Sequence, residues 1–212
     1  MKDKVAEFKA KLPVLLELGN PNMKPRHWER IFKAIKQPYF EGLEFTLSGM
    51  LENGILAHSE LVSEVSGTSS GEAQLEGSLK AVADGWETIN FVTINYRDAS
   101  GIYVLGGLEE IFTLLEDNQV TLQTMSGSRF ITGVKQDVDI WEKKLSLFSE
   151  TLDEWVQCQK TWMYLETIFG APDIQKQLPA ETQKFMTVDK VRIALFSLNQ
   201  NLLQTYSDLR VM

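Results

Sequence analysis

The chain has 212 residues, of which 43% are hydrophobic and 24% are charged, and its formal net charge is −8. This composition is typical of globular proteins, and an acidic chain without a basic stripe argues against nucleic-acid binding. The single cysteine, Cys158, excludes an intramolecular disulfide, and no stretch is long and apolar enough to cross a membrane. We therefore expect an intracellular, cytoplasmic protein without nucleic-acid or membrane partners.

The first part of the chain predicts short helices separated by turns. Apolar residues at helical spacing precede Gly19, and Pro13 indicates a helix start at "LPVLLELG". After the turn "GNPNMKP", a second helix is predicted from Pro25, with Trp28 on its apolar face. Two more short helices are expected between residues 45 and 65, split near Asn53.

The serine- and glycine-rich stretch "SGTSSG" (residues 66–71) is expected to be a flexible link. Ser69 and Glu72 are spaced like a capping box, which predicts that a new helix begins here and runs to about Ile89. Leu75, Leu79, Val82 and Trp86 would line one face of that helix.

Residues 91–105 predict a β-hairpin within an otherwise helical chain. Val92, Ile94 and Tyr96 alternate as in a strand, and "IYVL" supplies a second strand. The turn residues would be Asp98, Ser100 and Gly101. Two short helices should follow, one after Gly107 and one around residues 120–125, before a break at "SGSR".

The strongest periodic signal lies near the C-terminal end. Apolar residues recur at alternating steps of four and three, which is a heptad seam, and they are Val134, Val138, Trp141, Leu145, Phe148, Leu152 and Trp155. After a phase shift, the pattern continues through Cys158, Trp162, Leu165 and Phe169. This predicts a long helix from about 134 to 169 that needs helical partners, so the expected fold is mainly α, an elongated stack of antiparallel helical bundles.

Residues suited to catalysis are sparse. His27 and His58 lie far apart, and His27 is interpreted as a packing or hydrogen-bonding residue at a helix start rather than a catalytic one. Cys158 falls near the seam, which favours core packing over a reactive thiolate. No phosphate-binding loop motif occurs, so we expect no enzyme activity, cofactor or metal site in this chain. The five tryptophans are expected in the core; the alternative is a docking surface.

Several motifs in a fixed order resemble the second conserved N-terminal segment of dynein heavy chains. "RHW" (26–28) is followed by "EAQLEGSLKAVADGW" (72–86), "YVLGGLEEIFTLLEDN" (103–118) and "TMSGSRF" (124–130). The most distinctive stretch is "WEKKLSLFSETLDEWVQCQKTWMYLETIFGAPDIQKQLPAETQKF" (141–185). The details are more similar to axonemal than to cytoplasmic dyneins. The positions that match family motifs are Arg26, His27, Trp28, Leu75, Glu76, Trp86, Gly106, Trp141, Trp155, Gln159, Trp162, Tyr164, Leu165 and Glu166.

The resemblance implies a mechanical role. In dyneins this region is the linker, a helical arm that lies across the AAA+ ring of the same heavy chain and bends as the ring cycles through its ATP states. The chain would then transmit the power stroke in an axoneme and meet microtubules only through the full motor. Candidate ring contacts are Tyr96, Tyr103 and Leu105, and candidate joints are Gly19, Gly67 and Gly127.

The same resemblance suggests four parts. Residues 1–90 would form a first bundle, 91–105 the hairpin, 106–190 a second bundle around the long helix, and 191–212 a divergent C-terminal helix. The alternative function is a spectrin-like helical scaffold that binds another helical protein. For the hairpin, the alternative to a ring contact is a purely structural plug beside the helix that begins near Leu108.

Overall fold

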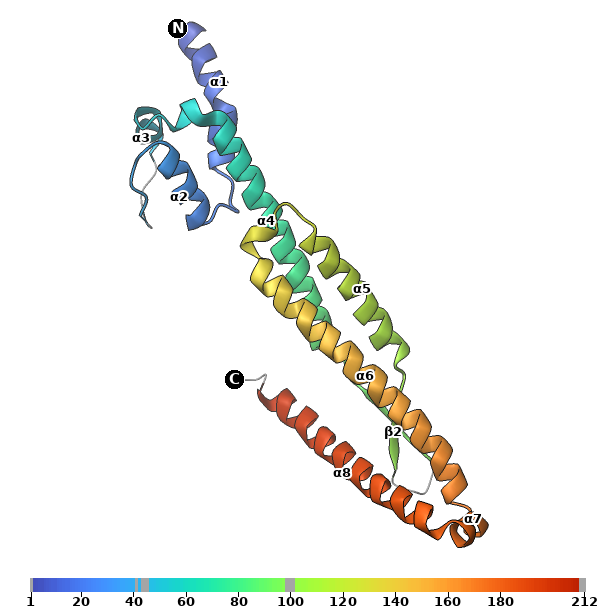
Figure 1. Ribbon diagram of the computed structural model, residues 1–212. Coiled ribbons are helices and arrows are strands. Elements are labelled where there is room, and N and C mark those ends of the chain that lie inside the picture. The colour runs from blue at the N-terminus through green and yellow to red at the C-terminus, as the bar shows by residue number, and fades with distance from the viewer. Residues whose placement is uncertain (1, 41, 43–45, 98–101, 210–212) are drawn as a thin grey trace. The chain divides into compact units, whose positions relative to one another are not determined.

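The computed structural model describes residues 2–40, 42, 46–97 and 102–209, without side chains at 2–4, 7, 51 and 195–209. Its described elements run in the order α1, α2, α3, η1, α4, β1, β2, α5, η2, α6, α7, α8, where η marks a 3₁₀-helix (Figure 1). The mainly helical fold with one small hairpin is confirmed. None of the described helices is long and apolar enough to span a membrane.

The first helix does not begin at Pro13, as the sequence suggested. α1 (Lys2–Leu18) runs straight through that proline. A proline inside a helix costs one backbone hydrogen bond, but Val14 and Leu18 beyond it are buried in the core, and this packing offsets the loss. α2 (Pro25–Ala34) starts at its proline as predicted, and it buries Ile31 and Phe32.

The expected flexible link at residues 66–71 is wrong. α3 (Leu47–Glu52) and η1 (Ile55–His58) lead into α4 (Ser59–Glu87), a 29-residue helix that includes the whole stretch. Ser69 therefore caps nothing, and its hydroxyl donates to the carbonyl of Ser66 at 2.8 Å instead. The small residues of this stretch allow other side chains to pack close to α4. A Cβ on Gly71, for example, would lie 2.3 Å from the ring of Phe130.

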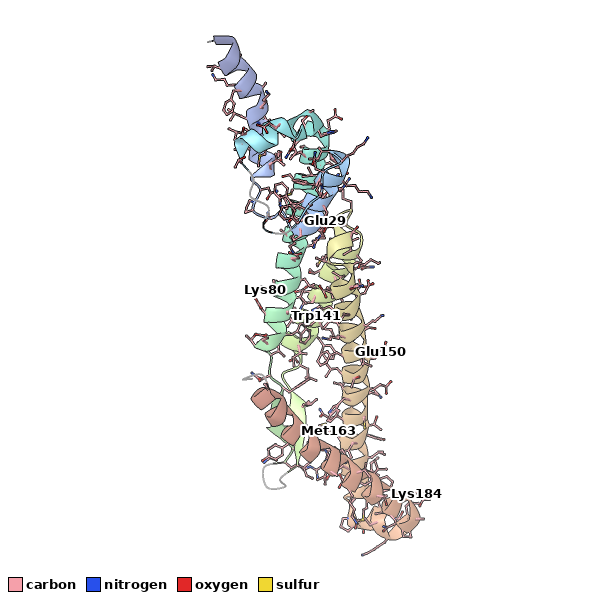
Figure 2. The ribbon with its side chains drawn as sticks, turned by 90° about the vertical axis from the view of Figure 1, so that its left-hand side faces the viewer. Glu29, Lys80, Trp141, Glu150, Met163 and Lys184 are labelled. Atoms are coloured by element: carbon pink, nitrogen blue, oxygen red, sulfur yellow. The ribbon has the colours of Figure 1, made fainter. Side chains whose placement is uncertain are left out.

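After the hairpin, one predicted helix boundary is corrected and the predicted long helix is confirmed. α5 (Glu109–Ser126) is a single helix where two short ones were predicted. η2 (Ile131–Gly133) then leads into α6 (Lys135–Phe169), and this 35-residue helix confirms the long spine. Every seam residue from Val134 to Trp155 is buried or half-buried. Trp141 points from α6 toward neighbouring helices (Figure 2).

Cys158 does not continue the core seam. Its side chain is exposed, so the core packing expected for it is wrong. The spacing of four and three residues continues from Trp155 through Gln159, Trp162 and Glu166, which contact other elements, so Cys158 lies one position beside that face of α6. Among the tryptophans, Trp162 is buried at 4% exposure, and Trp28, Trp86, Trp141 and Trp155 are half-buried.

The hairpin consists of β1 (Val92–Asn95) and β2 (Tyr103–Gly106), paired antiparallel with Ile94 opposite Val104. The expected turn residues 98, 100 and 101 lie outside the described residues. The Ile94 side chain covers Gly106, and a Cβ added to Gly106 would lie 2.1 Å from Ile94 Cδ1. Only a glycine therefore fits opposite Val92 without displacing Ile94.

After α6, the short α7 (Pro172–Gln177) leads into α8 (Pro179–Leu209), which turns back beside the C-terminal half of α6 (Figure 1). The chain forms two compact units: Met1–Ile89 with Glu116–Lys143, and Asn90–Leu115 with Lys144–Met212. The first is built on a core that includes Ile31, Phe32, Val62 and Val65. The division of the sequence into four parts stays a prediction.

Candidate functional site

In the second unit, the hairpin is attached to α6 through Gln159. Its side-chain carbonyl Oε1 accepts a hydrogen bond from the backbone N–H of Leu105 at 2.8 Å. Its Nε2 donates to the carbonyl of the same residue at 2.9 Å. The amide of Gln159 thereby imitates a neighbouring strand and satisfies both backbone groups of Leu105 on the outer edge of β2.

One turn further along α6, Trp162 joins three elements, and we call its surroundings the Trp162 cluster: Tyr96, Trp162, Asp189 and Arg192. The ring of Tyr96 meets Trp162 edge-on at 5.2 Å between centroids. The indole Nε1 donates to Asp189 on α8 at 2.9 Å, and the Arg192 guanidinium lies 3.6 Å from the indole centroid. A buried aromatic with a satisfied N–H and a cation over its face is a strong packing anchor.

A third contact fixes the beginning of the hairpin turn. Arg97 donates from Nη1 to Glu166 Oε1 at 3.0 Å, and its Nη2 lies 2.9 Å from Oε2. The backbone of Arg97 has φ +68°, a left-handed conformation that is uncommon outside glycine. Gln159, Trp162 and Glu166 thus present one face of α6 to the hairpin, at spacings of three and four residues.

In the first unit, α2 is held on α4 by a second polar group, the Glu72 cluster: Lys24, Arg26, His27, Glu72 and Glu76. The Glu72 carboxylate is buried and accepts from Arg26 Nε and from the His27 ring, both at 3.0 Å. Arg26 Nη2 also bonds Glu72, and Lys24 pairs with Glu76.

The hydrogen bonds define the tautomer of His27. The backbone N–H of Lys24 donates to Nδ1 at 3.0 Å, so Nδ1 is an acceptor and the ring proton is on Nε2, facing Glu72. The His27 side chain therefore supplies the half of a capping box that usually comes from Glu or Gln, by accepting from the N-cap backbone at the start of α2. The interpretation of His27 as a hydrogen-bonding residue at a helix start is confirmed.

The turn between α1 and α2 is attached to α4 by Asn20. Its Nδ2 lies within hydrogen-bonding distance of four oxygens, namely Ser66 O (3.1 Å), Ser66 Oγ (2.9 Å), Ser69 Oγ (3.1 Å) and Ser70 Oγ (2.8 Å). Its Oδ1 accepts from the backbone of Asn22 at 3.0 Å. The serines that suggested a flexible link are thus acceptors for a neighbouring turn.

Nothing in these clusters has the geometry of an acid–base or nucleophilic site. Among the described residues, no three His, Cys, Asp or Glu side chains converge as metal ligands. On the surface of α4, the Lys80 ammonium donates to the Asp84 carboxylate at 2.5 Å, and this hydrogen bond raises the pKa of Lys80. The Lys80–Asp84 pair lies within α4, whereas the Glu72 cluster, Gln159 and the Trp162 cluster connect different elements to one another.

Some of the residues that match family motifs form contacts between elements, and others lie at or near the surface. Arg26, His27 and Glu76 meet in the Glu72 cluster, and Gln159 and Glu166 contact the hairpin. Tyr164 is 68% exposed, and Leu165 and Leu75 are half-buried. The sequence reading missed Asn20, Glu72, Asp189 and Arg192 as contact residues, because their partners lie far away in the chain. For Glu72 one signal was available, because an acidic residue on the apolar face of a predicted helix indicates a buried polar contact.

Fold and site together define a helical structural element whose described polar clusters bind its own helices and hairpin to one another. The model of the family "Dynein heavy chain, N-terminal region 2" matches residues 1–205, and the chain belongs to this family. The match reaches into the C-terminal segment that was expected to be divergent.

Curated relatives agree with this assignment. The chain is similar to human dynein axonemal heavy chain 6, at 42% identity over 191 residues, covering 90% of this chain and 5% of the relative. It is 38% identical over 189 residues to human dynein axonemal heavy chain 2, covering 89% and 4%. The flagellar inner arm dynein-1-beta heavy chain of Chlamydomonas reinhardtii is 38% identical over 190 residues, covering 89% and 4%. The chain therefore spans about a twentieth of these relatives.

Proposed function

We propose that the chain is a mechanical linker segment of an axonemal dynein heavy chain. It docks on the AAA+ ring of the same heavy chain, bends with the ATP cycle, and transmits the power stroke to the rest of the motor in a cilium or flagellum. Microtubules are reached only through the full motor, and ATP is hydrolysed on the ring. The observation that supports this most is the family match over residues 1–205, together with axonemal relatives.

The clusters suit a mechanical element. A segment that transmits force needs stiff helices whose attachments resist sliding. α6 offers 35 residues of continuous helix, and the Trp162 cluster and Gln159 attach the hairpin and α8 to it through side-chain bonds. Each attachment uses a motif position on one face of the helix.

Of the three candidate ring contacts, Tyr103 is the best placed. Its side chain is 40% exposed, while Leu105 is half-buried and Tyr96 packs on Trp162. Gly19 and Gly127 lie just after α1 and α5, where a joint is feasible. Gly67 lies inside α4, so a joint there would be a bend of a continuous helix.

Binding to a purified AAA+ ring from the same heavy chain tests the proposal. We expect the chain to bind the ring with an affinity that depends on the nucleotide, and Tyr103→Ser to weaken binding about three- to tenfold. Leu147→Ser, at a still more exposed apolar position on α6 of the same unit (66% against 40% for Tyr103), is the control and should bind normally. No binding to the ring, with tight binding to an isolated helical protein, would favour the scaffold alternative.

A further inference from the structure

The two outer edges of the hairpin differ. Tyr96 N–H donates to Ile102 O at 2.7 Å, so these two residues form a hydrogen-bonded pair. Every second pair of an antiparallel ladder is of this kind, and the register makes Ile94 and Val104 the next one. The backbone groups of Thr93 and Asn95 on β1, like those of Leu105 on β2, therefore point away from the sheet. Each outer edge needs a partner of its own.

Only the β2 edge has one within the described chain. Gln159 satisfies both backbone groups of Leu105. No described residue bonds the outward N–H or C=O of Thr93 or Asn95, and all four residues of β1 are exposed. As far as the described residues go, the β1 edge has room for an incoming strand.

The β1 edge also lacks the features that normally protect an open edge. Natural proteins place lysine, proline or a bulge on exposed edge strands, since an unprotected edge pairs with other chains. From Thr88 to Tyr96 the sequence has no charge and no proline. Val92 and Ile94 are 54% and 51% exposed, so the strand offers apolar surface beside its free backbone groups. Such a strand is expected to be covered in the assembled protein.

A second copy of this chain is a poor fit to the edge. Pairing two strands of four residues buries far less than the roughly 1,200–2,000 Å² of a stable interface. A short strand is enough when it is already held close by, because tethering supplies a high effective concentration. A segment of the same polypeptide meets that condition.

We propose that the β1 edge binds an extended segment from the rest of the same heavy chain, which adds to the hairpin as a third strand. The inference rests on the proposed function and names the contact through which the linker docks. Backbone bonds to Thr93 and Asn95 supply the register, and uncharged β-branched or aromatic residues at alternate positions of the segment would cover Val92 and Ile94.

Hydrogen exchange resolved to single amides tests the edge directly. In the 212-residue chain, the amides of Thr93 and Asn95 should exchange quickly, and those of Ile94 and Tyr96 slowly. In the intact heavy chain, Thr93 and Asn95 should be at least tenfold better protected in one nucleotide state of the ring. If both stay as fast as in the isolated chain in every nucleotide state, the proposal is wrong.

Two variants of one residue separate edge pairing from other contacts. Thr93→Pro removes an outward N–H without touching the bonds between β1 and β2, whereas Thr93→Val keeps that N–H and the branched shape. We expect the proline variant alone to weaken docking of the chain on its ring by about three- to tenfold. Equal docking of both variants contradicts the strand addition.

The outcomes also separate this inference from the proposed function. A chain that docks on the ring while Thr93 and Asn95 stay unprotected is a linker without strand addition. A chain that does not dock at all fails as a linker. Protection that rises with the concentration of the isolated chain, together with a dimer in sedimentation, would show that a second copy occupies the edge and would overturn the proposal.

Discussion

The side-chain amide of Gln159 forms two hydrogen bonds with the backbone of Leu105, one in each direction, at 2.8 and 2.9 Å. A helix side chain here completes a sheet edge, so the position of the hairpin depends on the register of α6. The residue must be an amide, because only an amide offers a donor and an acceptor at the same spacing as a peptide group. This requirement gives a direct test.

Replacing Gln159 with Glu should release β2 from α6. The carboxylate still accepts from Leu105 N–H, but it sets an oxygen against the Leu105 carbonyl and loses the donor. We expect a loss of about 1–3 kcal/mol in the free energy of unfolding and faster exchange of the Leu105 amide. Urea unfolding and hydrogen exchange measure these two effects. Gln157→Glu, at an exposed position on the same helix, is the control and should change neither.

The two acidic residues of the Glu72 cluster should differ in their contribution to stability. Glu72→Ala leaves the buried His27 Nε2–H without its acceptor and removes the main partner of Arg26, so we expect a loss of about 2–4 kcal/mol. Glu76→Ala, one turn later, removes a carboxylate whose side chain is 34% exposed and should cost less than about 1 kcal/mol. Equal losses in urea unfolding would mean that burial of Glu72 has no energetic role.

Replacing Asn118 should raise the stability of the chain, in contrast to the substitutions above. It is buried on α5, and its Nδ2 has no hydrogen-bond partner among the described residues. Replacing it with leucine removes a desolvated donor and adds apolar contact, so we expect the chain to gain about 1 kcal/mol. Thermal unfolding measures the gain. A large loss of stability would indicate that the amide is bonded in solution.

Substitution by alanine should have opposite effects on stability at Gly133 and Gly67. A Cβ at Gly133 would lie 2.6 Å from Arg26 Nη2 and from Glu72 Oε2, so Gly133→Ala should disturb the Glu72 cluster and cost about 1–3 kcal/mol. A Cβ at Gly67 meets nothing within 4 Å, and Gly67→Ala should stabilise α4 by about 0.5–1 kcal/mol. If Gly67 is also a joint, this second variant should slow the motor although the chain is more stable, which gliding velocity of the full motor would reveal.

Periodicity predicted the long helix well and the helix boundaries poorly. The seam from Val134 to Trp155 is a sustained pattern that only one structure satisfies. At residues 66–71 the local signal was opposite to the result, because serine and glycine have low helix propensity and the reason for their presence lies elsewhere in the chain. Phe130 and Asn20 need small neighbours on α4, and a single sequence does not show which distant residues meet.

Several residues of the two clusters were named from the sequence as motif positions, but their contacts were not predicted. His27 was placed correctly as a hydrogen-bonding residue because it follows a proline that starts a helix. Its acceptor, Glu72, is 45 residues away and was interpreted as a helix cap. Asp189 and Arg192 were missed because α8 shows no heptad signal that would predict where it packs against Trp162.

Asn20 has two amide hydrogens and four oxygens within 3.1 Å. At any moment only some of these bonds are strong, and a small displacement exchanges one acceptor for another instead of leaving the amide without any. The attachment between the α1–α2 turn and α4 can therefore shift by fractions of an ångström at little enthalpic cost. A larger displacement would break every bond at once. The contact beside Gly19 therefore tolerates a small displacement of the turn along α4 and resists a larger one.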